Sequence, residues 1–155
     1  RQFGCQYGAL VEGREVAKVS GIYNLVATEE EYRKAYDFLR EEECKHKRLS
    51  FPTIVKKNRE DVIEALIGTI ESDKAVIAGP MLVHDKGQRP FFTVIRLIEA
   101  YEGVLTSMGI SSYIFRVDKE NRKFSHNIEM AGLVDIFAET SKSIWYKKEI
   151  GRRVQ

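Results

Sequence analysis

The sequence predicts an α/β (α+β) domain with a mixed, mostly antiparallel central sheet and helices on both of its faces. Segments with strand and helix patterns follow one another in the order β, α, β, β, β, α, β, α, β, β. The chain has 155 residues, 43% of them hydrophobic, which suits one domain with a core of ordinary size. It contains no internal repeat, low-complexity tract or linker rich in Pro, Gly or Ser, so nothing in it argues for a repeat architecture.

The first part of the chain predicts a strand and an amphipathic helix after a short leading segment. Residues 3–19 have the pattern of two extended stretches around a turn, and residues 22–26 that of a strand. Thr28 and Glu31 have the spacing of a capping box, which marks a helix start. Apolar residues then recur at the spacing of one helix face: Tyr32, Ala35, Tyr36 and Leu39.

The middle of the chain predicts three antiparallel strands. Pro52 ends any helix, and we expect extended structure to begin at Thr53. A turn at residues 58–61 leads to the strongly apolar run 62–70, expected in the middle of the sheet. The next apolar run, 75–83, contains Gly79-Pro80. Because proline donates no hydrogen bond to a ladder, we expect a bulge or an interruption there.

The last part of the chain predicts two helices, a strand and a hairpin. Pro90 suits the first position of a long helix, which ends at Gly109. Residues 112–117 predict a strand, and Asn121 is a good cap for the helix that follows. The remaining strands form a hairpin of residues 134–138 and 143–146.

The stretch from Asn121 to Leu133 has a recognisable spacing. Phe124 follows Asn121 at +3, and Gly132 and Leu133 follow at +11 and +12. This frame resembles the second half of a GNAT-type acyl-CoA N-acyltransferase domain, and the order of elements is similar to that of the family. The resemblance divides the chain into an N-terminal extension or hairpin (1–18), a GNAT-like domain (19–150) and a basic C-terminal tail (151–155).

The resemblance implies that acetyl-CoA or another acyl-CoA is bound and that its acyl group passes to an amine. In the family a loop of the form Arg-x-x-Gly-x-Gly or Ala holds the pyrophosphate on backbone amides at a helix start. Arg89 occupies the Arg position here, whereas Phe92 and Val94 stand where small residues belong. The implied cofactor-binding residues are Met81, Leu82, Val83, Arg89, Phe91, Phe92, Thr93 and Asn121.

The catalytic position also departs from the family pattern. The Tyr at +7, which gives a proton to the departing thiolate, is Ile128 here. In the family, acyl-CoA lies in a cleft between two splayed strands. His84, at the end of a strand that flanks this cleft, is a candidate base, although a lone His at a strand end is more often an ordinary surface residue. Orienting an amine against a thioester still allows acyl transfer. The expected function is an N-acyltransferase with a degenerate site and weak or no activity.

Two other functions stay open. The chain is alternatively a non-catalytic, structural or protein-binding component of a larger assembly or homo-oligomer, joined through its apolar N-terminal segment. Nucleic-acid binding would use basic and aromatic residues near the C-terminus, which interleave in a manner suited to stacking on bases. The net charge of +2 does not favour it. These residues are Lys142, Trp145, Tyr146, Lys147, Lys148, Arg152 and Arg153.

Cysteine, histidine and hydropathy restrict the class of protein further. Two cysteines, Cys5 and Cys44, are too few for a disulfide framework, which fits a reducing, intracellular (cytoplasmic) compartment. The histidines have no metal-ligand spacing, so no metal is expected. No apolar run is long enough to cross a bilayer, so no membrane partner is expected.

Overall fold

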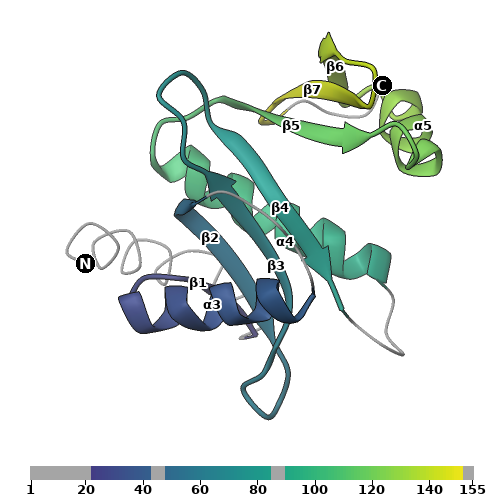
Figure 1. Ribbon diagram of the computed structural model, residues 1–155. Coiled ribbons are helices and arrows are strands. Elements are labelled where there is room, and N and C mark those ends of the chain that lie inside the picture. Colours follow the sequence, from purple (N-terminus) through teal and green to yellow (C-terminus); the bar gives the residue numbers. More distant parts are fainter. Residues whose placement is uncertain (1–21, 43–47, 85–89, 152–155) are drawn as a thin grey trace.

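A computed structural model describes residues 22–42, 48–84 and 90–151 (Figure 1). Seven strands form one sheet in the order β1-β2-β3-β4-β5-β7-β6, and β4 and β5 are its one parallel pair in this part of the chain. The predicted fold class is confirmed. The elements are β1 (Tyr23–Leu25), α3 (Glu29–Glu41), β2 (Leu49–Lys57), β3 (Ile63–Ile70), β4 (Ile77–Val83), α4 (Pro90–Ser107), β5 (Ser112–Asp118), α5 (Arg122–Met130), β6 (Val134–Glu139) and β7 (Ser143–Glu149).

The predicted N-terminal extension or hairpin lies outside the described residues. The helix that follows β1 begins as expected, because Thr28 and Glu31 form the capping box. The Glu31 N–H donates to Thr28 Oγ1 at 3.1 Å, and the Thr28 N–H donates to Glu31 Oε1 at 3.1 Å. These bonds satisfy two backbone donors that a helix start would otherwise leave unpaired.

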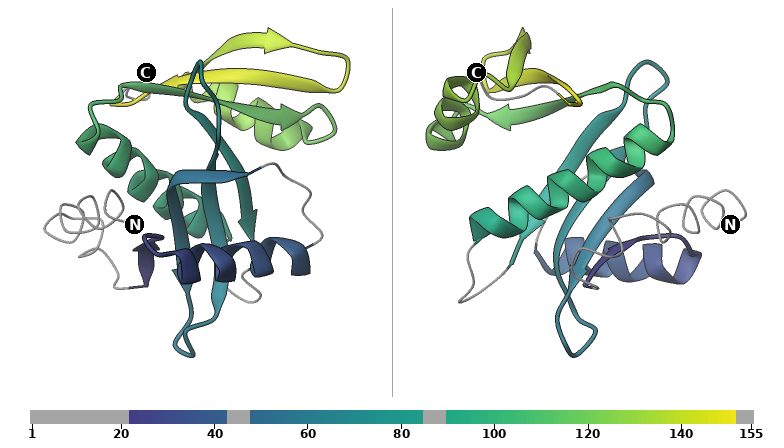
Figure 2. Two further views of the ribbon diagram at one scale, coloured as in Figure 1. Left: turned by 60° about the vertical axis from the view of Figure 1, so that its left-hand side comes forward. Right: turned by 180° about the vertical axis from the view of Figure 1, so that it is seen from behind.

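Two helices cover opposite faces of the first half of the sheet (Figure 2). Neighbouring residues of a strand point to opposite faces, so each strand contributes to both cores. Val55 and Leu66 pack in the core beneath α3, whereas Ile54 and Ile67 pack in the core beneath α4. The strand at 62–70 was expected in the middle of the sheet, and β3 lies between β2 and β4 as predicted.

The start of β2 corrects one expectation. Extended structure begins at Leu49 rather than at Thr53, and Pro52 lies inside the strand. The ladder between β2 and β3 tolerates this proline because its register shifts between Ser50 and Ile54. The carbonyl of Pro52 accepts a hydrogen bond from Thr69 Oγ1 at 2.7 Å.

The predicted irregularity at Gly79-Pro80 is a bulge in β4. Met81 lies opposite Ile67 and Ala78 lies opposite Thr69, so β4 has one residue more than β3 over this stretch. Gly79 has a φ of 140°, a conformation that residues with a Cβ rarely adopt. The bulge therefore depends on a glycine at this position.

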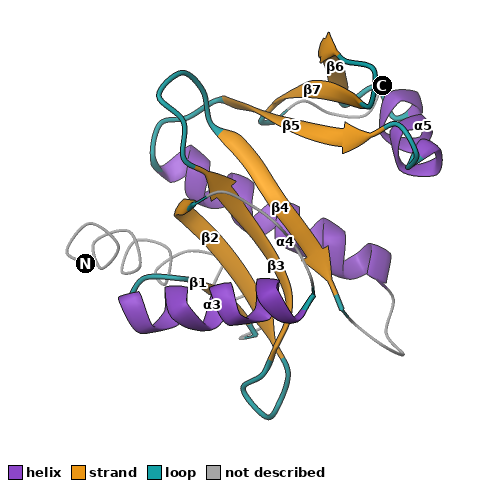
Figure 3. Cartoon of the chain, in the orientation of Figure 1, coloured by secondary structure: helices purple, strands orange, loops and turns teal. Residues whose placement is uncertain are grey.

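The second half of the sheet carries α4 and α5 on one face (Figure 3). Tyr113, Phe115 and Tyr146 form a row of rings with centroids 6.2 and 5.6 Å apart. The Tyr113 ring meets Tyr101 of α4, and the Tyr146 hydroxyl donates to Glu129 of α5 at 2.6 Å. On the other face, the core under α3 takes no described residue from β5, β7 or β6.

We expect Gly79→Ala to lower the free energy of unfolding by about 1–3 kcal/mol, because alanine is strained at this φ. Urea denaturation of the variant and the parent measures the change. Gly109→Ala is the comparison: Gly109, just after α4, also has a positive φ, of 79°, with no atom within 4 Å of an added Cβ, so its loss of stability gives the cost of this backbone strain away from the bulge. An unchanged urea midpoint for Gly79→Ala would show that β4 does not need the glycine.

Candidate functional site

Strands β4 and β5 diverge after a single point of pairing (Figure 1). In the described residues they are in register only at Ile77 and Ile114, where the Ile114 N–H donates to the Val76 carbonyl at 2.9 Å. Beyond this point β4 stays paired with β3, and β5 stays paired with β7. Residues 79–83 and 115–118 therefore present strand edges to each other that do not pair across.

The register of β4 shows which of its backbone groups point to this gap. Opposite residues of an antiparallel pair alternate between hydrogen-bonded and non-hydrogen-bonded pairs. The His84 N–H donates to the Glu64 carbonyl at 2.7 Å, so the next pair, Val83 with Ala65, is not hydrogen-bonded. Met81 with Ile67, two pairs further along, is also not hydrogen-bonded. The backbone N–H and C=O of Met81 and Val83 thus point away from β3 and towards β5.

The register of β5 gives the same result on the other side of the gap. The Lys119 N–H donates to the Lys142 carbonyl at 2.8 Å, which makes this pair hydrogen-bonded. Arg116 and its partner Trp145 lie three pairs away, in the other phase, so the backbone of Arg116 points towards β4. Ile114 shares this phase, and its observed bond to Val76 agrees with the assignment.

This geometry suits an extended ligand that has its own amide groups. Backbone donors and acceptors that have no partner in the protein need one in water or in a ligand. A chain lying between two diverging strands satisfies them on both sides, in the manner of strand addition. Met81 and Val83 pack their side chains in the core beneath α4, so it is their backbone that is offered to the gap.

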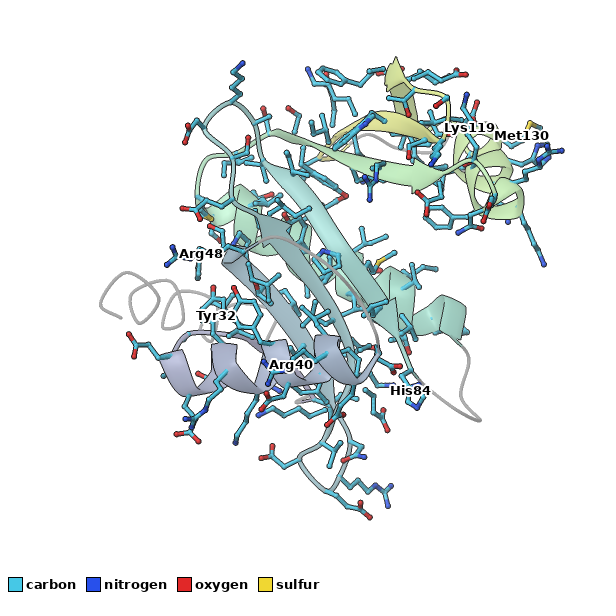
Figure 4. All side chains as sticks on the ribbon, viewed as in Figure 1. Tyr32, Arg40, Arg48, His84, Lys119 and Met130 are labelled. Atoms are coloured by element: carbon cyan, nitrogen blue, oxygen red, sulfur yellow. The ribbon has the colours of Figure 1, made fainter. Side chains whose placement is uncertain are left out.

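His84, the candidate base, lies at the end of β4 that is farthest from β5 (Figure 4). Its Nδ1 is 2.7 Å from Oε1 of Glu42, and its side chain is half exposed. The point where β4 and β5 meet, at Ile77, is about 20 Å away along the strand. The observed contact of His84 is with the end of α3.

Three tyrosines are buried near the gap, and each hydroxyl has a partner. Tyr101 is hydrogen-bonded to Thr69 Oγ1 at 2.7 Å, and Tyr113 donates to Glu102 Oε2 at 2.5 Å. Burial raises the pKa of Tyr101 and of Tyr113 far above the ordinary range, and the Glu102 carboxylate raises that of Tyr113 further. Burial, together with the bond to Glu129, also raises the pKa of Tyr146. None of the three is poised to give up a proton near neutral pH.

The residues predicted to hold the pyrophosphate are placed in part. Arg89 lies outside the described residues, and Phe91 lies in the first turn of α4. Phe92 is 51% exposed, whereas Thr93 is buried with its Oγ1 3.4 Å from Lys56 Nζ. Asn121 precedes α5 but makes no side-chain capping bond, so the expectation of a capping role is wrong. Its exposed side chain is thus available to a ligand.

Arg152 and Arg153 lie outside the described residues, and the basic and aromatic residues at 145–148 do not share one surface. Tyr146 is fully buried, and Lys148 Nζ lies 2.5 Å from Glu102 Oε2 with both side chains 14% exposed. Because neighbouring strand residues alternate, Trp145 and Lys147 lie on the opposite face of β7. The interleaving that suggested stacking on bases is therefore split between two faces.

Two observations concern ligands and membranes. Within residues 22–42, 48–84 and 90–151, His, Cys, Asp and Glu side chains do not gather in groups of three that suit a metal ion. None of the helices described there is long and apolar enough to cross a bilayer.

No protein-family model matches the sequence, and no curated protein matches it. Solved structures, in contrast, match the fold of this chain. A GNAT-family acetyltransferase from Staphylococcus aureus Mu50 has a TM-score of 0.60 at 13% identity, covering 83% of this chain and 99% of its own. A putative acyl-CoA N-acyltransferase from Klebsiella pneumoniae has a TM-score of 0.57 at 9% identity, covering 83% and 96%. A spermidine/spermine N-acetyltransferase from Vibrio cholerae has a TM-score of 0.58 at 12% identity, covering 84% of this chain and 95% of its own.

The chain has the GNAT fold. The resemblance inferred from Asn121, Phe124, Gly132 and Leu133 is confirmed at the level of the fold. At these levels of sequence identity the likeness concerns the GNAT fold alone, and the residues at the gap decide what this chain does with it.

The buried tyrosines predict an alkaline limit to stability. A folded-state pKa above the unfolded value means that stabilisation is complete below the unfolded pKa and is lost as the pH rises above it. Tyr101, Tyr113 and Tyr146 all have raised values, so we expect stability to fall as the pH rises above about 10. Tyrosinate absorbance during an alkaline titration, followed together with circular dichroism, measures this. Ionisation of all seven tyrosines near pH 10 in a protein that stays folded would contradict it.

Proposed function

We propose that this GNAT domain binds an acyl-CoA between β4 and β5 and transfers its acyl group to an amine. The observation that carries the proposal is the set of backbone groups of Met81, Val83 and Arg116 that face the gap. The pantetheine arm of CoA is an extended chain with two amide groups, and these match the donors and acceptors of a strand edge. Residues 81–83 are also among those that the sequence resemblance implied for cofactor binding.

The direction of the bound acyl-CoA follows from where α4 begins. The first turn of α4 follows β4 at the open end of the gap, and a helix N-terminus favours a phosphate group. The diphosphate is thus assigned to that end, with Arg89 and the free side chain of Asn121 as its remaining polar ligands. Pro90 supplies no amide donor, so the pantetheine contacts have a larger share in the binding. The thioester then lies near the bulge at Gly79.

In the proposed reaction a neutral amine attacks the thioester carbonyl carbon. A C–N bond forms, the C–S bond breaks, and one proton passes from the amine to the departing thiolate. Ile128 has no proton to give, and the hydroxyls of Tyr101, Tyr113 and Tyr146 are engaged elsewhere. We assign the proton transfer to water and the rate enhancement to positioning. A missing general acid lowers the rate by about 10²–10⁴-fold, so a slow enzyme is expected.

A second candidate function, a non-catalytic binding module, is favoured by one observation. Three large apolar side chains near the free edge of the sheet are exposed: Met130 by 74%, Ile136 by 55% and Phe137 by 59%. Exposed apolar groups at a strand edge favour association with another protein. The measurement that separates the two functions is isothermal titration with acetyl-CoA. Micromolar binding supports the transferase, and no heat at millimolar acetyl-CoA supports the module.

Val83→Pro tests whether backbone groups hold the acyl-CoA. It removes the N–H that faces the gap, while the neighbouring bonds to β3 are retained. We expect acetyl-CoA affinity to fall by about tenfold, the value of one hydrogen bond of about 1.4 kcal/mol. Val83→Ala is the control, because it trims the side chain and keeps the donor. Equal loss of affinity in both folded variants would assign the effect to packing.

Ile128→Tyr tests the missing acid. The change introduces a phenol at the position where the family has its Tyr, and we expect kcat for acyl transfer to rise by about 10²-fold. Ile128→Phe adds the same ring without the hydroxyl and controls for packing at this half-buried site. Steady-state rates of CoA release with an amine acceptor give the comparison. Equal rates for both variants would mean that position 128 does not face the thioester.

A further inference from the structure

Arg116 lies at the narrow end of the gap. It is two residues beyond Ile114, where β5 leaves β4, and so lies across from the bulge at Gly79 and Pro80. When acyl-CoA binds with its diphosphate at the start of α4, the thioester occupies this end. A side chain of Arg116 that reaches past the strand edge therefore meets the acceptor rather than the CoA.

The face on which the Arg116 side chain lies follows from alternation along β5. Tyr113 and Phe115 point to the face covered by α4 and α5. Arg116 thus points to the opposite face, where it is exposed. Among the described residues it has no ion pair or side-chain hydrogen bond. Two lysines of the same part of the sheet, in contrast, form ion pairs: Lys119 with Glu139 at 2.7 Å and Lys148 with Glu102 at 2.5 Å.

Trp145 gives this arginine an apolar neighbour. Arg116 and Trp145 are opposite each other in a non-hydrogen-bonded pair, the type in which side chains of adjacent strands come closest. Trp145 is half-buried, and Ala138 stands beside it on β6. A guanidinium next to an indole binds an anion more strongly than one surrounded by water, because the local dielectric constant is lower.

We propose that Arg116 selects an acceptor that carries a carboxylate close to its amine, as amino acids do. The inference rests on the proposed acyl transfer. The planar guanidinium binds a carboxylate through two parallel hydrogen bonds, which fixes the acceptor and leaves its neutral amine free to attack the thioester carbon. A C–N bond forms and the C–S bond breaks, with one proton passing from nitrogen to sulfur through water.

The charge on Arg116 also disfavours polyamines. A second ammonium group close to the guanidinium is repelled, whereas a carboxylate is attracted. The Vibrio cholerae structural neighbour acts on spermidine and spermine by its name. Asp118, the next residue of β5 on the Arg116 face, accepts from Ser143 Oγ at 3.4 Å and forms no ion pair with Arg116.

The test uses acceptors that differ only in the carboxylate. L-alanine, L-lysine and L-phenylalanine are each compared with their amides, and spermidine is included. For each acceptor, kcat and KM are measured at saturating acetyl-CoA, and binding to the protein–acetyl-CoA complex is measured by calorimetry. We expect the amino acid of a pair to have a KM about 10- to 100-fold below that of its amide, with a smaller change in kcat.

Arg116→Gln should reduce this preference by about 10- to 100-fold, and Arg116→Lys should retain part of it. Arg59→Gln is the matched control, because Arg59 is an exposed arginine in the turn between β2 and β3. It should leave the preference unchanged. Equal KM values for acids and amides, or a preference for spermidine, would overturn the inference while acetyl-CoA binding upholds the proposed function. If acetyl-CoA does not bind, the proposed function fails, and this inference fails with it.

Discussion

The extra residue in β4 is the constraint on which the rest of the site depends. Before the bulge, Val76 accepts a bond from β5, and after it Met81 and Val83 point their backbone groups to the same side. Without the bulge, the alternation would direct the backbone of Leu82 to the gap. The side chains of Met81 and Val83 would then point to the core beneath α3 instead of the core beneath α4. The pairing of β4 with β5, at Ile77, lies before this extra residue, and no described residue of β4 after it pairs with β5. The bulge, with Gly79 at a φ of 140°, thus sets which backbone groups line the opening.

A chain of buried polar contacts holds the two halves of the opened sheet together. With a single point of β4–β5 pairing, the sheet itself offers little resistance to hinge motion at Ile77. Helix α4 crosses this point. Its Tyr101 bonds to Thr69 of β3, and its Glu102 accepts bonds from Tyr113 of β5 and Lys148 of β7. Removing one member of such a network leaves a buried group unpaired, so the halves are held in one arrangement.

The fold was predictable from local signals, and the site was predictable only in part. The capping box of Thr28, the apolar periodicity and the Gly79-Pro80 pair each determine local structure, and the order of elements follows from them. Asn121 misled, because its backbone, at a φ of −88° and a ψ of 61°, is not in the extended conformation from which a capping side chain reaches the first amides of its helix. Arg116 was missed for a different reason. Its proposed role depends on strand phase and on the end of β5 at which β4 departs, and neither is visible in the residues around it.

Binding of the proposed acyl donor and choice of its amine acceptor depend on different atoms of the protein. Backbone groups hold an extended ligand whatever side chains the strands carry, provided the bulge and the register persist. In the proposed function, proton transfer and acceptor choice depend on single side chains. At 9–13% identity to its structural neighbours, this chain keeps the diverging strands and has Ile128 at the acid position. In the proposed function, the GNAT fold therefore supplies a place for the thioester, and the residues beside that place decide which amine reaches it and how fast it reacts.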